Sequence, residues 1–434
     1  MLRIKCCMHR SIVFESDRKS VVSSSDPDLF PSSSAESSVA GLSPDVIERV
    51  TTAVEARKET YVEFLERLAR IETPSTDPET ILPAFDLLAS ALAEAGLTSV
   101  HFPGVETAGS LYARPDVRRR GGSVQLLLGH VDTVWSTGTL QHMPVVRQNG
   151  MLRGPGVFDM KAGLTSFVFA LRTLRDLGLT PPADPVVLIT SDEEIGSHES
   201  RRHIDRLARC ADRVFVTEPG LGLQGKIKTA RKGTGEYVIL LYPEEVDASE
   251  VVAEMMEIVQ RLHGLNDPDR GITVNVGTIT GPNASEEAGR LGVDVRVVTH
   301  EDAHRIDTRL REQVCGDVRD GIRVEIRGGV ERPPMERTPG NRKLWHAAQA
   351  IGAAIGDTLE EDRAGGASDG NFTSIHAPTL DGLGAVGDGA HAEHEFAKID
   401  ATVRRCALLA LLLMAPVHGA RPVTANGPET ENHE

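Results

Sequence analysis

A histidine and an aspartate stand two positions apart, directly after a run of apolar residues. The run Leu126–Leu128 is followed by Gly129 and then by His130-Val131-Asp132. Side chains two positions apart on an extended segment point to the same side. His130 can therefore bind a metal ion while the Asp132 carboxylate orients its ring. The pair alone is a weak signal, because the same spacing also occurs in strands that bind no metal.

A second candidate ligand lies in a turn that is rich in glycine and proline. Asp159 belongs to the segment 154–163, which reads GPGVFDMKAG. Glycine and proline allow the chain to turn tightly before the helix that we expect next. Asp159 is therefore a candidate metal ligand, and the alternative is that it only caps this helix.

Carboxylates follow two further apolar runs of the chain. Asp192, Glu193 and Glu194 come after Val186–Thr190, and Glu218 comes after the next such run. Adjacent acids repel one another unless a cation lies among them, although a solvated loop could also hold them. These carboxylates are therefore candidates for metal binding and for acid–base chemistry.

A late segment, residues 387–395, carries two histidines in the sequence GDGAHAEHE. Its glycines let the backbone approach a metal closely, and we favour His391 over His394 as the ligand. Imidazole together with carboxylates suits zinc, and also manganese or cobalt. A two-metal centre needs a shared carboxylate and a second histidine. The predicted cofactor is therefore two divalent metal ions, with zinc as the first expectation and manganese or cobalt as alternatives.

The elements that must position these residues alternate between strands and helices. Apolar runs at Val124–Leu128, Val186–Thr190 and Arg213–Thr217 predict strands, and a helix is expected near Gly163–Asp176. This alternation predicts an α/β fold with a mostly parallel sheet and helices on both faces. Ligands gather at the carboxyl ends of such strands. Upstream, Ser43-Pro44 starts a helix, and one apolar stripe runs along it as far as Leu68.

The pattern changes in the second half of the chain. We expect strands at 234–243, 271–280, 290–298 and 321–328, and helices at 247–263 and 300–315. The order β-α-β-β-α-β is that of the ferredoxin-like split unit. Helices near 341–355 and 398–414 then resume the larger pattern. The predicted domains are a disordered extension (1–42), a catalytic domain in two parts (43–224 and 333–416), an inserted lid and dimerisation domain (225–332) and a flexible tail (417–434).

Composition excludes several partners. The net charge of −16 argues against nucleic acid, which needs a basic surface. No apolar run approaches the roughly 18–20 residues of a membrane span, and the first 22 residues lack the apolar core of a signal peptide. The five cysteines form no disulfide framework. We therefore expect a cytoplasmic protein in which Cys210, Cys315 and Cys406 are small core residues.

These motifs resemble those of a known group of enzymes. GHVDTVW (129–135), GPGVFDMKAG (154–163), SDEEIGS (191–197) and TEPG (217–220) look like segments of the di-zinc exopeptidases and deacylases. That group contains glutamate carboxypeptidase, aminoacylase, acetylornithine deacetylase and succinyl-diaminopimelate desuccinylase. The glutamate carboxypeptidase branch is the most similar, over roughly residues 45–416. The resemblance implies hydrolysis of an amide or peptide bond next to a free carboxylate, in a small peptide or an N-acyl amino acid.

The resemblance also implies a role for each candidate residue. One metal would be held by His130 and Glu218, the other by Glu194 and His391, and Asp159 would bridge the two. Glu193 would be the general base, and Asp132 would support His130.

Further residues match positions that bind substrate in the family. Arg332 resembles the arginine that holds the substrate's carboxylate, which suits a planar guanidinium. Arg296 and Asn283 fall at other substrate-binding positions, although Arg296 could be a solvated strand residue and Asn283 a turn residue. The segment Gly365–Asp369 resembles a loop that lines the active site, and Asp369 could instead cap a helix.

One feature departs from the family pattern. The family follows the first strand of its lid with a loop whose histidine reaches the active site of the partner subunit in a homodimer. Here the strand Tyr237–Leu241 runs through Tyr242–Asp247 directly into a helix, and no histidine occurs between His203 and His263. The alternative function is therefore a metal-binding pseudoenzyme, or a slow and specialised relative. The resemblance implies a homodimer through the lid, and the altered lid leaves the oligomeric state open.

Overall fold

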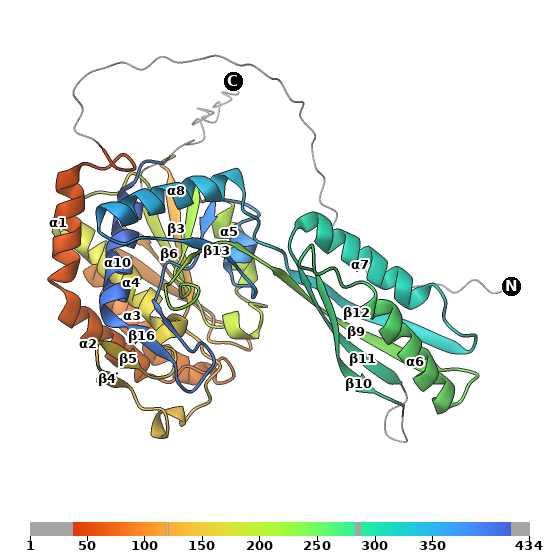
Figure 1. Cartoon of the computed structure of the whole chain (residues 1–434). Coiled ribbons are helices and arrows are strands. Elements are labelled where there is room, and N and C mark those ends of the chain that lie inside the picture. Colours follow the sequence, from red (N-terminus) through yellow and green to blue (C-terminus); the bar gives the residue numbers. More distant parts are fainter. Residues whose placement is uncertain (1–37, 118, 120, 283–287, 418–434) are drawn as a thin grey trace, which may run out of the picture. The chain divides into compact units, whose positions relative to one another are not determined.

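The computed structural model describes residues 38–117, 119, 121–282 and 288–417, and Figure 1 labels most of their helices and strands. We call β9 to β12 with α6 and α7 the inserted domain, and the other elements the large domain. The helices of the large domain are α1 (Pro44–Glu55), α2 (Lys58–Ala69), α3 (Pro78–Glu94), α4 (Ala162–Asp176), α5 (Arg201–Ala208), α8 (Pro339–Ala354), α9 (Gly370–Thr373) and α10 (Ile399–Met414). Its strands are β1 (Leu97–Phe102), β2 (Ser110–Pro115), β3 (Val124–His130), β4 (Val146–Gln148), β5 (Met151–Arg153), β6 (Asp184–Thr190), β7 (Arg213–Val216), β8 (Ile227–Arg231), β13 (Glu361–Ala364), β14 (Thr379–Leu380), β15 (Gly387–Asp388) and β16 (Phe396–Lys398).

The main sheet of the large domain has six strands in the order β1-β2-β6-β3-β7-β14. The strand β3 is parallel to both β6 and β7, and β14 is parallel to β7. The strands β1 and β2 add an antiparallel edge. The prediction of a mostly parallel sheet is confirmed, and the three predicted strands are the neighbours β6, β3 and β7.

Helices cover both faces of this sheet, as the strand pattern predicted. Along β3, Leu127 packs into a core that contains residues of α1 to α4 and α10. Its neighbours Leu126 and Leu128 point the other way, into a second core with Ile204 of α5 and Phe372 of α9. Burial on both sides explains why β3 reads as a continuous apolar run rather than an alternating one.

Some local expectations need correction. The single helix expected after Ser43 is two helices, α1 and α2, because the backbone leaves the helical conformation at Arg57, between them. The Ser43 hydroxyl does cap α1, accepting from the Val46 amide at 3.4 Å. Cys406 is buried, but Cys210 and Cys315 are exposed and are not core residues. Each of the two follows the last buried turn of an amphipathic helix.

The inserted domain is a four-stranded antiparallel sheet with two helices. Its elements in chain order are β9 (Gly233–Pro243), α6 (Ala248–His263), β10 (Thr273–Thr280), β11 (Gly289–Val297), α7 (His300–Cys315) and β12 (Ile322–Arg332). The sheet order is β10-β11-β9-β12, which is the ferredoxin-like arrangement. Apolar residues of both helices and of the sheet form a separate core. The domain boundaries themselves stay predictions.

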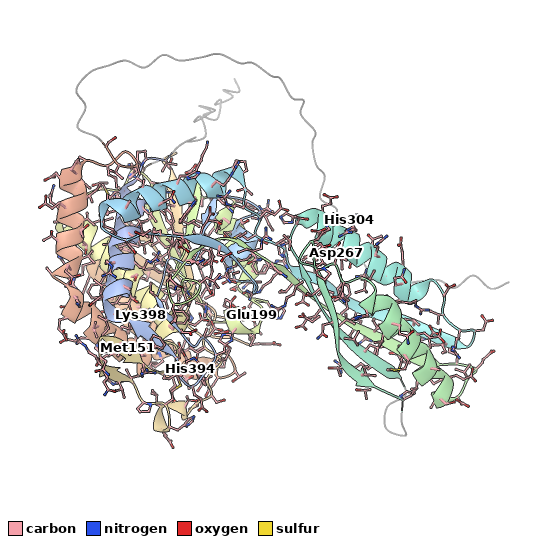
Figure 2. The ribbon with its side chains drawn as sticks, in the orientation of Figure 1. Met151, Glu199, Asp267, His304, His394 and Lys398 are labelled. Atoms are coloured by element: carbon pink, nitrogen blue, oxygen red, sulfur yellow. The ribbon has the colours of Figure 1, made fainter. Side chains whose placement is uncertain are left out.

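Two small sheets complete the large domain, and the sequence pattern did not indicate them. The strands β8 and β13 pair in parallel. The strands β15, β16, β5 and β4 form an antiparallel sheet in which Lys398 lies opposite Met151; both residues are labelled in Figure 2. Among the described residues, no helix is long and apolar enough to cross a membrane. The predicted extension and tail fall almost entirely outside the described residues.

Candidate metal centre

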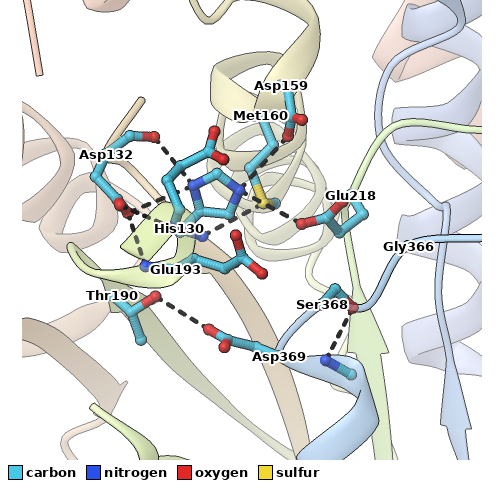
Figure 3. A network of polar contacts seen from close by, with 12 residues as sticks. His130, Asp132, Asp159, Met160, Thr190, Glu193, Glu218, Gly366, Ser368 and Asp369 are labelled. Atoms are coloured by element: carbon cyan, nitrogen blue, oxygen red, sulfur yellow. Dashed lines mark hydrogen bonds and ion pairs between the residues drawn. The ribbon is translucent and has the colours of Figure 1, made fainter. Parts of the chain in front are cut away.

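The ends of three neighbouring strands bring the first candidate ligands together (Figure 3). His130 is the last residue of β3, and Glu218 follows β7 by two residues. The acidic segment from Asp192 to Glu194 follows β6, which pairs with β3 on the side opposite β7. Because these strands are parallel, their carboxyl ends share one edge of the sheet.

One half of the centre is formed around His130, which is buried. Its Nε2 atom lies 3.5 Å from Asp159 Oδ1 and 3.4 Å from Glu218 Oε1. Asp159 reaches this position from the helical turn Val157–Lys161, where its backbone angles are extended rather than helical. Asp159 therefore presents its side chain to the sheet edge.

The other half is formed around His391. Its Nε2 atom lies 3.5 Å from Asp159 Oδ2 and 3.0 Å from Glu194 Oε2. His391 has a left-handed φ of 61° in a loop where Gly389 has a φ of 88°, so the glycine-rich turn does position the histidine. His394 is exposed, and its carbonyl accepts from Arg153 at 3.5 Å. The structure thus brings His391, rather than His394, to the centre.

The donor set fits a pair of divalent cations. The two oxygens of Asp159 face two different histidines, as a bridging ligand must. Oδ1 is buried and has no hydrogen-bond partner within the described residues. A buried carboxylate oxygen without a donor is destabilising unless a cation satisfies it. Ligand atoms of His130, Asp159 and Glu194 all lie within 4.8 Å of one another, and so do those of His130, Glu193 and Glu218.

The electrostatics of the two halves differ. Hydrogen bonding to Asp159 and Glu194 raises the pKa of His391 to about 10. Burial raises the pKa of Glu194 to about 7, and it also raises the pKa of Glu193 above its ordinary value. For Glu218 burial acts in the same direction, but Arg231 and His130 outweigh it and lower the pKa to about 2.

Asp132 holds more than the ring of His130. His130 Nδ1 lies 3.0 Å from the Asp132 backbone carbonyl and 3.4 Å from Oδ1. The Asp132 carboxylate also accepts from the backbone amides of Glu193 at 3.3 Å and Glu194 at 3.2 Å, and from the Ser75 hydroxyl at 2.7 Å. This buried carboxylate therefore fixes the acidic turn after β6 together with the histidine.

Two positively charged side chains beside Glu218 were missed by the sequence analysis. Arg231, the last residue of β8, donates through Nη2 to Glu218 Oε2 at 3.0 Å and through Nε to Asp381 Oδ2 at 2.6 Å. Lys228 Nζ lies 3.8 Å from Glu218 Oε2. The Ser368 hydroxyl donates to Asp381 at 2.8 Å. Lys228 and Arg231 lie three positions apart in β8, and no local sequence pattern marks either residue as part of the centre.

Arg332 lies at the centre, in contact with the predicted base. It ends β12 and is buried. Its guanidinium pairs with the Glu193 carboxylate and donates to the Glu193 carbonyl at 2.6 Å and to the Ser197 hydroxyl at 3.0 Å. Asp369 is buried nearby and accepts from Ser197 and from Thr190. Asp369 stands at the start of α9, but its side chain makes no cap hydrogen bond, so the capping alternative is wrong.

The remaining substrate-binding candidates are less informative. The Arg296 side chain is 44% exposed and lies 3.6 Å from Asp294, while its Nη1 donates to the Gly365 carbonyl at 2.9 Å. It therefore contacts the predicted active-site loop through that loop's backbone. Asn283 lies outside the described residues.

The chain is similar to several known proteins. The model of peptidase family M20/M25/M40 matches residues 126–415. Carboxypeptidase G2 of Pseudomonas sp. (strain RS-16) is 27% identical over 368 residues, which cover 81% of this chain and 88% of the relative. Succinyl-diaminopimelate desuccinylase of Caulobacter sp. (strain K31) is 28% identical over 320 residues, which cover 66% of this chain and 79% of the relative.

Solved structures share the fold. Aminopeptidase PepT from Bacillus cereus ATCC 10987 superposes with a TM-score of 0.67 at 18% identity, covering 82% of this chain and 98% of that one. A dinuclear metal-binding M20 peptidase from Bacillus subtilis has a TM-score of 0.63 at 14% identity, and the match covers 83% of this chain and 98% of that one. The predicted α/β class is therefore confirmed, and the order of elements in the inserted domain is the predicted one.

Proposed function

Because the chain belongs to peptidase family M20/M25/M40, and with it to the metal-dependent peptidases and amidohydrolases, we propose that it cleaves an amide or peptide bond next to a free carboxylate. The proposed substrate is a small peptide or an N-acyl amino acid. The proposed cofactor is two divalent metal ions, with zinc first and manganese or cobalt as alternatives. The similarity to carboxypeptidase G2 and to succinyl-diaminopimelate desuccinylase supports a substrate with a terminal carboxylate.

One observation carries the proposal. The two carboxylate oxygens of Asp159 lie 3.5 Å from the Nε2 atoms of His130 and His391, one oxygen to each histidine. Glu218 and Glu194 each stand beside one of these histidines. This arrangement supports two metal positions that share a bridging carboxylate, with His130 and Glu218 at one and His391 and Glu194 at the other.

Two metal ions held by these residues would act as Lewis acids that polarise the attacking water and the scissile carbonyl. Glu193 is the proposed general base, which takes the proton of the attacking water and delivers it to the leaving amine. Its burial raises its pKa, so its carboxylate accepts a proton more readily than an exposed glutamate does. Asp132 keeps this base in place, since it accepts from the Glu193 amide.

Arg332 is the proposed partner of the substrate carboxylate. Its planar guanidinium matches a carboxylate in a two-pronged contact. In the structure this guanidinium pairs with the Glu193 carboxylate. A substrate carboxylate that takes over part of this pairing would release the base at the moment of binding. Arg296 and Asn283 remain weaker proposals for substrate contact.

A second candidate function is a metal-binding protein with little or no turnover. The observation that favours it is the direct passage from β9 into α6, in a stretch of chain without the histidine that the family resemblance leads us to expect. In that case the centre would load metal normally but would hydrolyse slowly.

A single series of measurements tests both candidates. The purified chain is loaded with Zn²⁺ or Mn²⁺, its metal content is measured, and a panel of dipeptides and N-acyl amino acids is tested for hydrolysis. The proposal predicts two ions per chain, a reduced content in His130→Ala, and hydrolysis that depends on added metal. Two ions without hydrolysis would favour the second candidate, and a content near zero would contradict both.

A further inference from the structure

Glu395 is a buried carboxylate for which neither the motifs nor the proposed mechanism gives a role. Its exposed fraction is 1%. It accepts four hydrogen bonds: from the Trp135 indole at 3.0 Å and from the backbone amides of Gly156, Phe158 and Asp159 at 3.0, 2.9 and 3.0 Å. A carboxylate that accepts several N–H groups is held in one orientation and in turn fixes the groups that donate to it.

The four donors come from two segments, and each segment carries a proposed metal ligand. Trp135 closes the segment that begins at His130. The three amides form the turn that ends at Asp159, including the amide of Asp159 itself. Glu395 belongs to a third segment, since it follows His391 by four residues and its own amide donates to the Ala392 carbonyl at 2.9 Å. One carboxylate therefore connects three segments that carry ligands.

The backbone around Glu395 is closely packed, so this connection has little freedom. A side-chain carbon at Gly389 would lie 2.7 Å from the Glu395 Cα atom. Gly389 and Gly156 have left-handed φ values of 88° and 71°. Strand β16 begins directly after Glu395 and pairs with β5, whose last residue precedes the turn 154–159. The Asp159 turn is thus joined to the end of the His391 loop twice. Strand pairing joins them where the turn begins, and the Glu395 carboxylate joins them where the turn ends.

We propose that Glu395 is a positioning residue that sets the bridging carboxylate of Asp159 between His130 and His391. The inference rests on the proposed function, because it concerns the same two metal positions. Glu395 is not one of the proposed ligands. It acts through the three backbone amides that determine where the Asp159 side chain begins, and through the short loop that it shares with His391.

The test compares Glu395→Gln with Glu393→Gln. Both substitutions remove one negative charge from the same loop, but Glu393 is exposed. In Glu395→Gln the new NH2 group replaces an oxygen that accepts two N–H donors, so at least two of the four hydrogen bonds are lost. Competition with a chelator measures the affinity of the chain for Zn²⁺. We expect Glu395→Gln to weaken binding by about 10- to 100-fold, as outer-shell substitutions do, and Glu393→Gln to bind as the parent does.

A spectroscopic readout separates positioning from simple stability. The chain has two tryptophans, and Trp345→Phe leaves Trp135, which donates to Glu395, as the reporter. In this background we expect the Trp135 emission to change on Zn²⁺ loading, and the change to be lost in Glu395→Gln. Thermal unfolding of the metal-free variants identifies any that do not fold. If Glu395→Gln does not fold, Trp135→Phe removes one donor, keeps an aromatic ring, and should weaken Zn²⁺ binding by a smaller factor.

The outcomes distinguish this inference from the proposed function. If the parent chain binds no Zn²⁺, the proposed function is wrong. If the parent binds two ions, and a folded Glu395→Gln or Trp135→Phe variant binds them with unchanged affinity, the role of Glu395 is wrong and the proposed function stands. A variant that unfolds at lower temperature but keeps the parent's affinity and emission change would also overturn the positioning role.

Discussion

The two halves of the centre are built from different kinds of structure. The half around His130 uses the ends of β3 and β7, and its histidine is 2% exposed. The half around His391 uses a glycine-rich loop, and the side chain of this histidine is 52% exposed. Arg231 and Lys228 surround the carboxylate of the first half. In the second half, Asp132 accepts a hydrogen bond from the backbone amide of Glu194 and so fixes the backbone that carries the Glu194 carboxylate.

This difference has a physical consequence. A buried half with fixed neighbours reorganises little on binding, so it should hold its cation more tightly and exchange it more slowly. The half that is open to solvent should load last and lose its ion first. Asp159 belongs to both halves, so a change in one half is expected to alter the metal affinity of the other. The following predictions test this comparison.

The largest effect is expected at Glu193, whose carboxylate lies beside His130 and Glu218 of the buried half. Glu193→Gln removes the proposed base and preserves the side-chain shape. We expect turnover to fall by about 10²–10⁴-fold, while the metal content stays at two ions per chain. Steady-state kinetics and elemental analysis of the same sample check this. Turnover within a few-fold of the parent would show that Glu193 is not the base.

A smaller effect is expected at Arg231, which bonds the carboxylate of the buried half only. Arg231→Gln leaves Glu218 and Asp381 without their shared cation, and we expect the tighter of the two Zn²⁺ affinities to weaken by about 10- to 100-fold. Chelator competition resolves the two affinities. Arg323→Gln, at an exposed arginine in the inserted domain, is the matched control. A selective loss of the weaker affinity would reverse the assignment of the halves.

Metal loading should release protons from both halves. The pKa of His391 is raised to about 10, and that of His130 lies well above 6.5 because its carboxylate neighbours outweigh its burial. With a pKa of about 10, His391 is protonated at pH 7.5 in the metal-free chain, whereas a metal ligand must be neutral, and the raised pKa of His130 acts in the same direction. We expect metal loading to release protons, and about one fewer per chain in His391→Ala. Titration calorimetry in buffers of different ionisation enthalpy measures this number, and a value near zero would contradict the raised pKa values.

The smallest effect, no change at all, is expected on dilution. All five proposed ligands come from one chain, and the segment between β9 and α6 carries no histidine for a partner's site. Turnover per chain should therefore stay constant across a dilution series that spans dimer and monomer. Activity that collapses on dissociation would show that a partner residue completes the site.

The two halves also differ in how far the sequence predicts them. His130 and Glu218 each follow an apolar run. Because both faces of the main sheet are buried, such runs can be recognised as strands from the sequence. The main sheet is predicted for the same reason, whereas the strands of the inserted domain are predicted from alternation, because one face of that sheet is buried. The strands β4, β5, β15 and β16 have two or three residues each, which is too short for any periodicity.

The neighbours of the ligands were not predictable, because they depend on contacts between distant segments. Glu395 lies 260 positions from the tryptophan that bonds it, and no local pattern marks either residue. Arg231 was missed because its role depends on Asp381, which lies 150 positions away. Arg332 was predicted to bind the substrate carboxylate, but its pairing with Glu193 across 139 positions was not foreseen.

The insertion of one domain within another also sets an order in time. His130, Asp159, Glu194 and Glu218 all precede the inserted domain, whereas His391 follows it. At a synthesis rate of about 5–20 residues per second, His391 leaves the ribosome roughly 10–35 seconds after Glu218. During that interval the nascent chain exposes four ligands without the fifth. The ligands of the His130 half are therefore all synthesised before the inserted domain, whereas the other half must wait for the last part of the large domain.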